Sequence, residues 1–219
     1  MPTALCSITN RRKAPRSGRF FQRFGATYDP NHLASYQSVN NALWLAVEKG
    51  EITPAVVKVL RFELFLKNIG VAYPPDAFSA KYLECLAECS ELIEGAAEVV
   101  QGLQGKYRMA ILTNGLQVVQ RGRLARSAIR QHIDEVVISE EIGFAKPAKE
   151  FFDTALARLG NPSRQDALMI GDGWATDILG AARYGLDVCW YNPARKPRPS
   201  DCALTREIAS LSELTEWLG

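Results

Sequence analysis

The hydrophobic positions divide the chain into two parts with different patterns. From about residue 20 to residue 87, apolar side chains recur at steps of three and four residues, as at Val56, Leu60 and Leu64, which predicts helices throughout. After about residue 92, short apolar runs alternate with helical patterns of ordinary length. This alternation is typical of a doubly wound, Rossmann-like parallel sheet with helices on both faces. The expected fold is therefore α/β, with an all-helical unit ahead of the sheet.

Four apolar runs in the second part are expected to form strands. They span residues 107–113, 135–139, 167–171 and 188–191, and a weaker run lies near 203–208. Open parallel sheets place their chemistry at the carboxyl ends of the strands. The polar residues that directly follow these runs are therefore the first candidates for a functional site.

One group of candidates suits phosphate binding. Thr113, Asn114 and Gly115 end the first run, and a hydroxyl beside backbone N–H groups at the start of a helix can hold phosphate oxygens. Lys146 follows the second run and would add a positive charge that screens phosphate and carboxylates. Each feature alone is common, because Thr-Asn-Gly is usually a turn and Lys-Pro usually a helix start.

A second group suits a metal ion. Asp172 directly follows the run 167–171, and Asp177 lies five residues later, across the expected turn into a helix. The turn can bring both carboxylates to one hard-cation site of the Mg²⁺ type. Mg²⁺ at this place would neutralise charge on a transferring phosphoryl group, so it is the expected cofactor.

The order of these segments resembles a known family. Ile111–Gly115, Gly143–Pro147 and Gly171–Asp177 closely resemble motifs two, three and four of the haloacid dehalogenase-like phosphohydrolases, and the resemblance covers residues 93–219. It implies a Rossmann-like core at 93–219, with the helical cap of that family at 19–92.

The same resemblance implies roles for the candidates. Thr113 and Lys146 would be catalytic residues that contact the phosphate, while Asp172 and Asp177 would organise Mg²⁺. Tyr36-Gln37-Ser38-Val39-Asn40 and Ile52-Thr53 look like the branch of pyrimidine 5′-nucleotidases, which hydrolyse nucleoside monophosphates. A HAD phosphatase acting on a sugar phosphate or phosphoglycolate is the alternative within the class. A non-catalytic nucleotide- or phosphate-binding protein is the alternative from another class.

One part of the family pattern is missing. These phosphatases use a first motif, Asp-x-Asp-x-Thr, at the end of the central strand, where one Asp is the nucleophile and the other the general acid/base. The first acidic residue of this chain is Asp29, in a turn-like Tyr-Asp-Pro, so no nucleophile is assigned. We expect residues 1–18 to stand in place of the first strand and motif, and we expect the chain as written to be inactive.

The start of the chain is also unusually basic. Residues 1–28 hold six basic residues and no acid, although the whole chain has a net charge of +2. A nucleic-acid arm or a transit-like peptide would have this composition. A third hypothesis is an out-of-frame start: read from the third base of each codon, residues 1–9 can spell Ala-Asp-Gly-Thr-Leu-Phe-Asp-Tyr-Glu. With an Asp codon ahead of it, that is the missing first motif.

Composition limits the remaining classes. No apolar run approaches the roughly 20 residues that span a bilayer, and no signal-peptide pattern follows the basic start, so we expect a cytoplasmic protein without a membrane partner. Of the five cysteines, only Cys85 and Cys89 are close, and no further zinc ligands accompany them. The expected partner is a small phosphorylated substrate, a nucleoside monophosphate. The chain beyond residue 28 is mildly acidic, so we do not expect nucleic acid as a partner.

Overall fold

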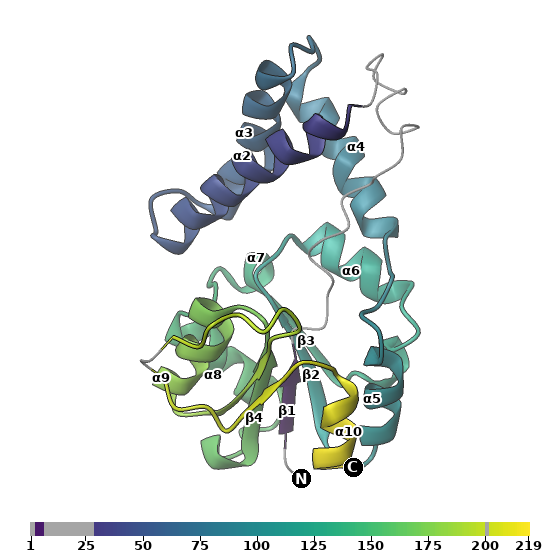
Figure 1. Ribbon diagram of the computed structural model, residues 1–219, viewed down its shortest axis with the longest axis vertical. Coiled ribbons are helices and arrows are strands. Elements are labelled where there is room, and N and C mark those ends of the chain that lie inside the picture. Colours follow the sequence, from purple (N-terminus) through teal and green to yellow (C-terminus); the bar gives the residue numbers. More distant parts are fainter. Residues whose placement is uncertain (1–2, 7–28, 200–201) are drawn as a thin grey trace. The chain divides into compact units, whose positions relative to one another are not determined.

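The computed structural model describes residues 3–6, 29–199 and 202–219 (Figure 1). The chain forms two compact units. The core unit consists of Met1–Asn10 and Ser90–Gly219, and the helical unit consists of Arg11–Cys89. The helical unit is therefore inserted into the core unit early in the chain.

The described part of the helical unit consists of α2 (Pro30–Glu48), α3 (Pro54–Asn68) and α4 (Pro75–Glu88), as its hydrophobic pattern predicts. The Asp29 side chain accepts the Asn31 N–H across 2.8 Å and caps the start of α2. α3 packs against both of the other helices. Its contacts with them are largely aromatic: the Phe62 ring centre lies 5.9 Å from Tyr36 of α2 and 4.9 Å from Tyr82 of α4. These rings form the core of the unit.

The core unit contains a six-stranded sheet in which every pair of neighbouring strands is parallel, in the order β3-β2-β1-β4-β5-β6. Its strands are β1 (Thr3–Cys6), β2 (Arg108–Thr113), β3 (Glu135–Ile138), β4 (Ala167–Gly171), β5 (Asp187–Tyr191) and β6 (Arg206–Ile208). This is the doubly wound order, which reverses direction between β1 and β4. The predicted α/β fold class is thereby confirmed.

Helices cover both faces of the sheet. α5 (Ala96–Leu103), α6 (Gln117–Ala125) and α10 (Ser212–Leu218) contribute to one apolar cluster, together with Met109 and Ile111 of β2. α8 (Lys149–Arg158) and α9 (Gly180–Tyr184) contribute to the other, with Ala110 and Leu112. Successive β2 residues thus face opposite layers, as the period of a strand requires. The shorter elements are η1 (Arg130–His132), α7 (Ser139–Ile142), η2 (Arg164–Asp166) and the π-helix η3 (Trp174–Leu179).

Part of the anomalous N-terminal segment, residues 3–6, stands in the place of the first strand. Thr3–Cys6 form β1 in the middle of the sheet, where Cys6 is in register with Ile111 of β2 and Ile170 of β4. Without β1, the facing edges of β2 and β4 would leave backbone groups without partners inside the sheet. The hydrogen bonds between neighbouring strands join backbone groups and do not depend on particular side chains. A short segment of modest β-propensity, such as Thr3–Cys6, can therefore complete the sheet. The rest of the basic segment, residues 7–18, lies outside the described residues.

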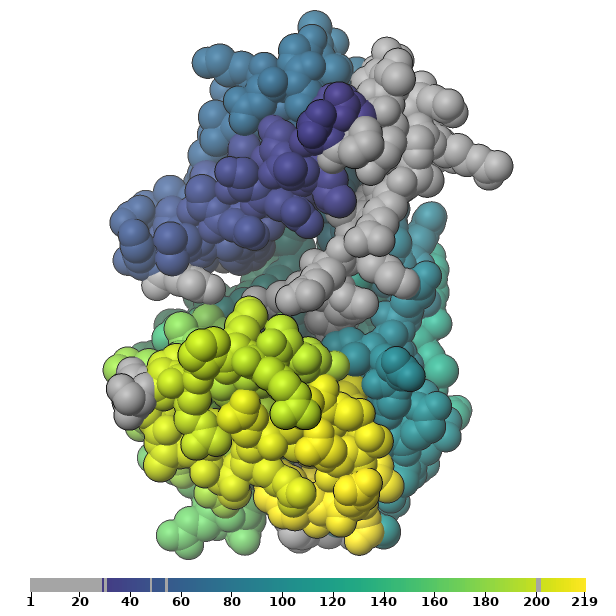
Figure 2. All heavy atoms as spheres, in the orientation of Figure 1, coloured from purple at the N-terminus to yellow at the C-terminus, as the bar shows by residue number. Residues whose placement is uncertain are grey.

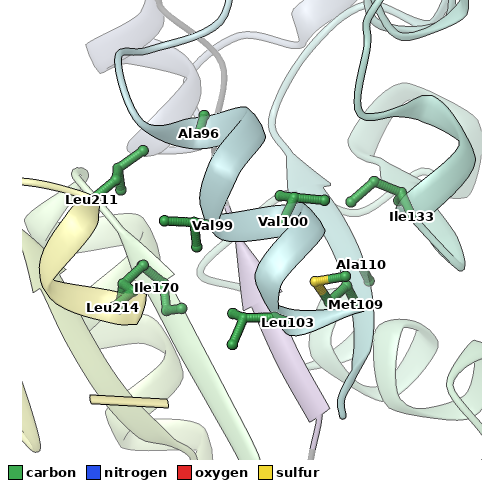
Figure 3. Close-up of a pocket in the computed structure, with 10 residues that line it drawn as sticks. All are labelled: Ala96, Val99, Val100, Leu103, Met109, Ala110, Ile133, Ile170, Leu211 and Leu214. Atoms are coloured by element: carbon green, nitrogen blue, oxygen red, sulfur yellow. The ribbon is translucent and has the colours of Figure 1, made fainter. Parts of the chain in front are cut away.

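A small cavity lies between the sheet and the helices α5 and α10 (Figure 3). Its volume is about 20 Å³, and ten apolar residues line it: Ala96, Val99, Val100, Leu103, Met109, Ala110, Ile133, Ile170, Leu211 and Leu214. One water would fit in this volume, but the lining side chains offer it no hydrogen-bond partner. The cavity is therefore a packing gap in the core and has none of the polar groups that orient a substrate.

The C-terminal segments spread over one face of the core unit, where the chain after β5 is drawn in yellow-green to yellow (Figure 2). Within the described ranges, none of the helices combines the length and the apolar composition needed to cross a membrane. This agrees with the absence of a long apolar run in the sequence.

Candidate active site

The candidate residues meet at the carboxyl ends of β2 and β4, on either side of β1. Cys6 is level with Ile111 and Ile170, so Thr113 and Asp172 each lie two positions beyond the residue that pairs with Cys6. The order of the sheet reverses at this place, which is where open α/β sheets bind ligands. The register of the strands thus places Thr113 and Asp172 at the same level of the sheet, although they are 59 positions apart in the sequence.

The loop after β2 is tied to the loop that carries Lys146. The Asn114 side chain donates to the Lys146 carbonyl oxygen across 2.8 Å and accepts the Lys146 backbone N–H across 2.7 Å. This paired bond fixes the Lys146 backbone against the end of β2. Thr113 ends the strand and is buried. Asn114 therefore positions Lys146, in addition to the phosphate contact predicted for it.

Ser139 is a buried residue of the site that the sequence reasoning missed. Its Oγ accepts the Gly115 N–H across 3.1 Å, so this N–H, predicted to bind phosphate, already has a partner in the ligand-free chain. A phosphate would have to replace that bond. The position of Ser139 in the sequence could have identified it as a candidate, because it directly follows the strand β3, as Asn114 directly follows the strand β2.

Lys146 is held in a fully buried ion pair. Its Nζ donates to Asp177 Oδ1 across 2.7 Å and to the Leu112 carbonyl oxygen across 2.9 Å, and neither side chain of the pair is exposed to solvent. An ammonium group has three N–H donors, and the described residues take two of them. The third donor is the one that we consider for an anion under the proposed function.

Asp177 receives hydrogen bonds from three directions. Besides Lys146, the Gly173 N–H donates to its Oδ2 across 3.0 Å and the Thr176 hydroxyl to its Oδ1 across 3.2 Å. The π-helix η3 turns this carboxylate back over the end of β4. A Cβ added at Gly171 would lie 2.6 Å from the Asp177 Cβ, so only glycine fits there. Thr176, like Ser139, was absent from the sequence-based candidates.

Asp172 has a different environment, because its side chain is exposed. Its carbonyl oxygen accepts the Trp190 indole N–H across 3.4 Å, and Trp190 in turn packs edge-on against Trp174 at 4.8 Å between ring centres. Trp190 thus contacts the backbone of the loop after β4, and Trp174 packs against Trp190, while the Asp172 carboxylate remains accessible. Such an accessible carboxylate can bind a cation without first breaking an ion pair.

These residues fit a partial Mg²⁺ site. Asp172 would be a direct ligand, and Asp177 would be the second carboxylate behind it. Mg²⁺ is commonly bound by one or two carboxylates, with waters and substrate phosphate completing its shell. In the described part of the chain no cluster of three or more Asp, Glu, His or Cys side chains exists, and residues 1–28 contain no acid by sequence.

Comparisons with known proteins agree with this geometry. The model of the haloacid dehalogenase-like hydrolases matches residues 30–185. Pyrimidine 5′-nucleotidase YjjG of Escherichia coli (strain K12) is 36% identical over 200 residues, which are 91% of this chain and 88% of that protein. Pyrimidine 5′-nucleotidase PynA of Streptococcus pneumoniae is 29% identical over 184 residues, 84% of this chain and 78% of that protein.

A solved structure matches the whole chain. The crystal structure of the HAD-hydrolase YfnB of Bacillus subtilis, bound to magnesium, has a TM-score of 0.91 and 32% sequence identity. The match covers 100% of this chain and 98% of that chain.

Proposed function

Because the chain belongs to the haloacid dehalogenase-like hydrolases, we propose that its site is that of a Mg²⁺-dependent nucleoside 5′-monophosphatase which, as written, lacks its nucleophile. The observation that carries the proposal is the buried Lys146–Asp177 pair, clamped by Asn114 at the carboxyl end of the sheet. The pair fixes a positive charge where a phosphate group would bind.

The residues of the site would divide the work as follows. The Thr113 hydroxyl and the third N–H of Lys146 would hold phosphate oxygens, and Asp177 would hold the Lys146 side chain in position through its hydrogen bond. Asp172, with Asp177 behind it, would hold Mg²⁺, which when bound neutralises charge on the phosphoryl group. We also propose that residues 19–92, which contain most of the helical unit, are the cap and that residues 93–219 are the catalytic core.

The missing group is the nucleophile. Ser7 and Ile8 follow Cys6 in the sequence, and neither carries a carboxylate. Phosphoryl transfer to an aspartate splits a very slow hydrolysis into two faster steps, and that route is closed here. The chain as written would therefore bind a phosphorylated ligand and release very little phosphate. The absence of a carboxylate directly after Cys6 in the sequence is the observation that favours the second candidate, a non-catalytic phosphate-binding protein.

The substrate is tested on a chain whose first residues are replaced by Asp-Ala-Asp-Gly-Thr-Leu-Phe-Asp-Tyr-Glu, preceded by a hydrophobic strand. We expect kcat/KM for pyrimidine nucleoside 5′-monophosphates to exceed that for phosphoglycolate and ribose 5-phosphate by about tenfold or more. Phosphate release with Mg²⁺ measures this. Equal or better turnover of phosphoglycolate or ribose 5-phosphate would instead identify the alternative phosphatase.

The metal role is tested on the chain as written. We expect Asp172→Asn to weaken Mg²⁺ binding about tenfold or more, because Mg²⁺ binds a charged carboxylate much better than a neutral amide. Titration of tryptophan fluorescence measures it, since Trp190 contacts the backbone of Asp172. Asp166→Asn is the matched control, an exposed carboxylate just before the other end of β4. Equal Mg²⁺ affinities of both variants would contradict the assignment.

A further inference from the structure

The helical unit contains a buried arginine whose hydrogen-bonding groups are only partly used. Arg61 of α3 is 4% exposed. Its Nη1 donates to Asn40 Oδ1 of α2 across 3.4 Å, which is a long bond. Its Nε and Nη2 are closed to solvent and have no hydrogen-bond partner among the described residues. These two atoms form one edge of the planar guanidinium, with two parallel N–H donors.

Nothing in the described part of the chain neutralises this charge. The acids of α3 and α4 have exposed side chains, and the ion pairs of the described residues do not include Arg61. Residues 11–28, which complete the helical unit, contain no acid by sequence. Burial, followed by the neighbouring Tyr36, raises the pKa of Tyr82 well above its usual value, so this phenol stays neutral. A guanidinium is costly to bury without a counter-ion.

The surroundings hold the guanidinium in place. Its Cζ lies 4.6 Å from the Phe62 ring centre and 5.3 Å from that of Tyr82. Asn40 Oδ1 also accepts the Tyr36 hydroxyl across 3.4 Å, which orients the amide. The hydrogen bonds that the half-buried Asn40 amide makes through its Oδ1 leave its Nδ2 donor for another partner. Two donor groups of Arg61 are thus buried beside aromatic rings without an acceptor among the described residues, next to this amide.

We propose that Arg61 and Asn40 form a binding site for an oxyanion, a phosphate or carboxylate group, inside the helical unit. Two oxygens of the anion accept from Nε and Nη2 of Arg61, and the Asn40 amide donates a further bond. The edge is closed to solvent in the ligand-free chain, so binding displaces a covering side chain. This site is separate from the phosphate site at Thr113 and Lys146, and it needs no nucleophile.

A site of this kind has a recognisable effect on stability. If Arg61 serves a ligand, its charge is uncompensated in the free protein, and replacing it by a hydrophobic side chain of similar length removes that penalty. If Arg61 instead holds the helices together, the same replacement destabilises the unit. We expect Arg61→Met to melt at the same temperature as the unchanged chain or at a higher one, in buffer without oxyanions. Lys67→Met, an exposed change on the same helix, is the matched control.

Binding is measured directly by NMR on the full ¹⁵N-labelled chain. The Arg61 Nε–H signal is assigned by its loss in Arg61→Lys and followed during titration with sodium phosphate, sodium acetate and, at equal ionic strength, sodium chloride. We expect a saturable shift with phosphate or acetate and none with chloride. Whichever of the two acts at lower concentration identifies the class of anion. A further titration with uridine 5′-monophosphate and with uridine shows whether the oxyanion can arrive as part of a nucleotide.

Two results would overturn the proposal. One is an Arg61 Nε–H signal that does not respond to phosphate or acetate, or responds equally to chloride. The other is a fall of about 10 °C or more in the melting temperature of Arg61→Met with no change in Lys67→Met, which would show a structural role. Failure of phosphate release by the core site affects neither measurement, so the two proposals are tested independently.

Discussion

Replacing Lys146 by methionine is expected to lower the free energy of unfolding by about 3–5 kcal/mol. The replacement leaves the Asp177 carboxylate fully buried without its ammonium partner, which lies 2.7 Å away in the unchanged chain. It also leaves the Leu112 carbonyl oxygen without the Nζ donor. Removing one member of a buried ion pair is more damaging than removing both, because the remaining charge has no compensation. Urea unfolding, followed by circular dichroism, measures the loss.

The matched control for this change is Lys149→Met. Lys149 is the first residue of α8, three positions after Lys146, and also pairs with an aspartate, Asp153, across 2.6 Å, but both side chains are exposed. Water screens such a pair, so we expect almost no change in the urea midpoint. Comparable midpoints for Lys146→Met and Lys149→Met would show that burial of the first pair has no energetic consequence, contrary to our account.

A double variant separates charge from packing. Adding Asp177→Asn to Lys146→Met removes the stranded charge, while the one Asn oxygen can still accept either the Gly173 N–H or the Thr176 hydroxyl, which bind different oxygens of Asp177. We expect the double variant to be more stable than Lys146→Met alone, with a coupling between the two sites of the size seen for residues in direct contact. Additive losses would mean that the two side chains act independently.

The second large expected effect is on catalysis. Supplying the Asp-x-Asp motif at the end of the central strand should raise the rate of phosphate release from a nucleoside 5′-monophosphate by on the order of 10⁵-fold or more, because loss of a nucleophile has effects of this size in other enzymes. Lys146, Thr113 and the exposed Asp172 already lie at the carboxyl ends of the strands in the chain as written. Under our proposal, the chain lacks only the atom that would attack phosphorus.

Three chains compared under one condition test this. They are the chain as written, the version with the re-read first motif, and that version with the first Asp of the motif changed to Asn. We expect phosphate release only from the second. Sequencing the gene and its upstream bases shows whether a single insertion or deletion restores the motif. Robust turnover by the chain as written would contradict both the assigned role of the missing motif and the expected inactivity.

The sequence was sufficient for features that depend on neighbouring residues. The three-to-four-residue periodicity around Leu60 identified the helices of the helical unit, and the apolar runs before Thr113 and Asp172 identified β2 and β4. Side-chain burial on a helix or strand repeats with a short period, so it is visible in the order of residues. The positions of the polar residues at strand ends followed from the same pattern.

Other features depended on residues far apart in the chain. Thr3–Cys6 have no strong strand pattern, yet they form the central strand because both β2 and β4 present backbone groups to them. Ser139 was not a candidate from the sequence, and the clamp that Asn114 forms on Lys146 became visible only when the fold placed Ser139 beside Gly115 and Asn114 beside Lys146. The incomplete hydrogen bonding of Arg61 was equally hidden, since an arginine on a helix is usually exposed.

The sequence by itself therefore determined the family, the α/β class and the set of strand-end residues, because each is encoded in local spacing. Only the tertiary structure decided which strand completes the sheet, that Asp177 pairs with Lys146 while Asp172 remains exposed, and that Arg61 is buried without an ion pair among the described residues. The physical reason is that desolvation and backbone pairing depend on what surrounds a group in space. Those surroundings are assembled from segments that are tens to more than a hundred residues apart.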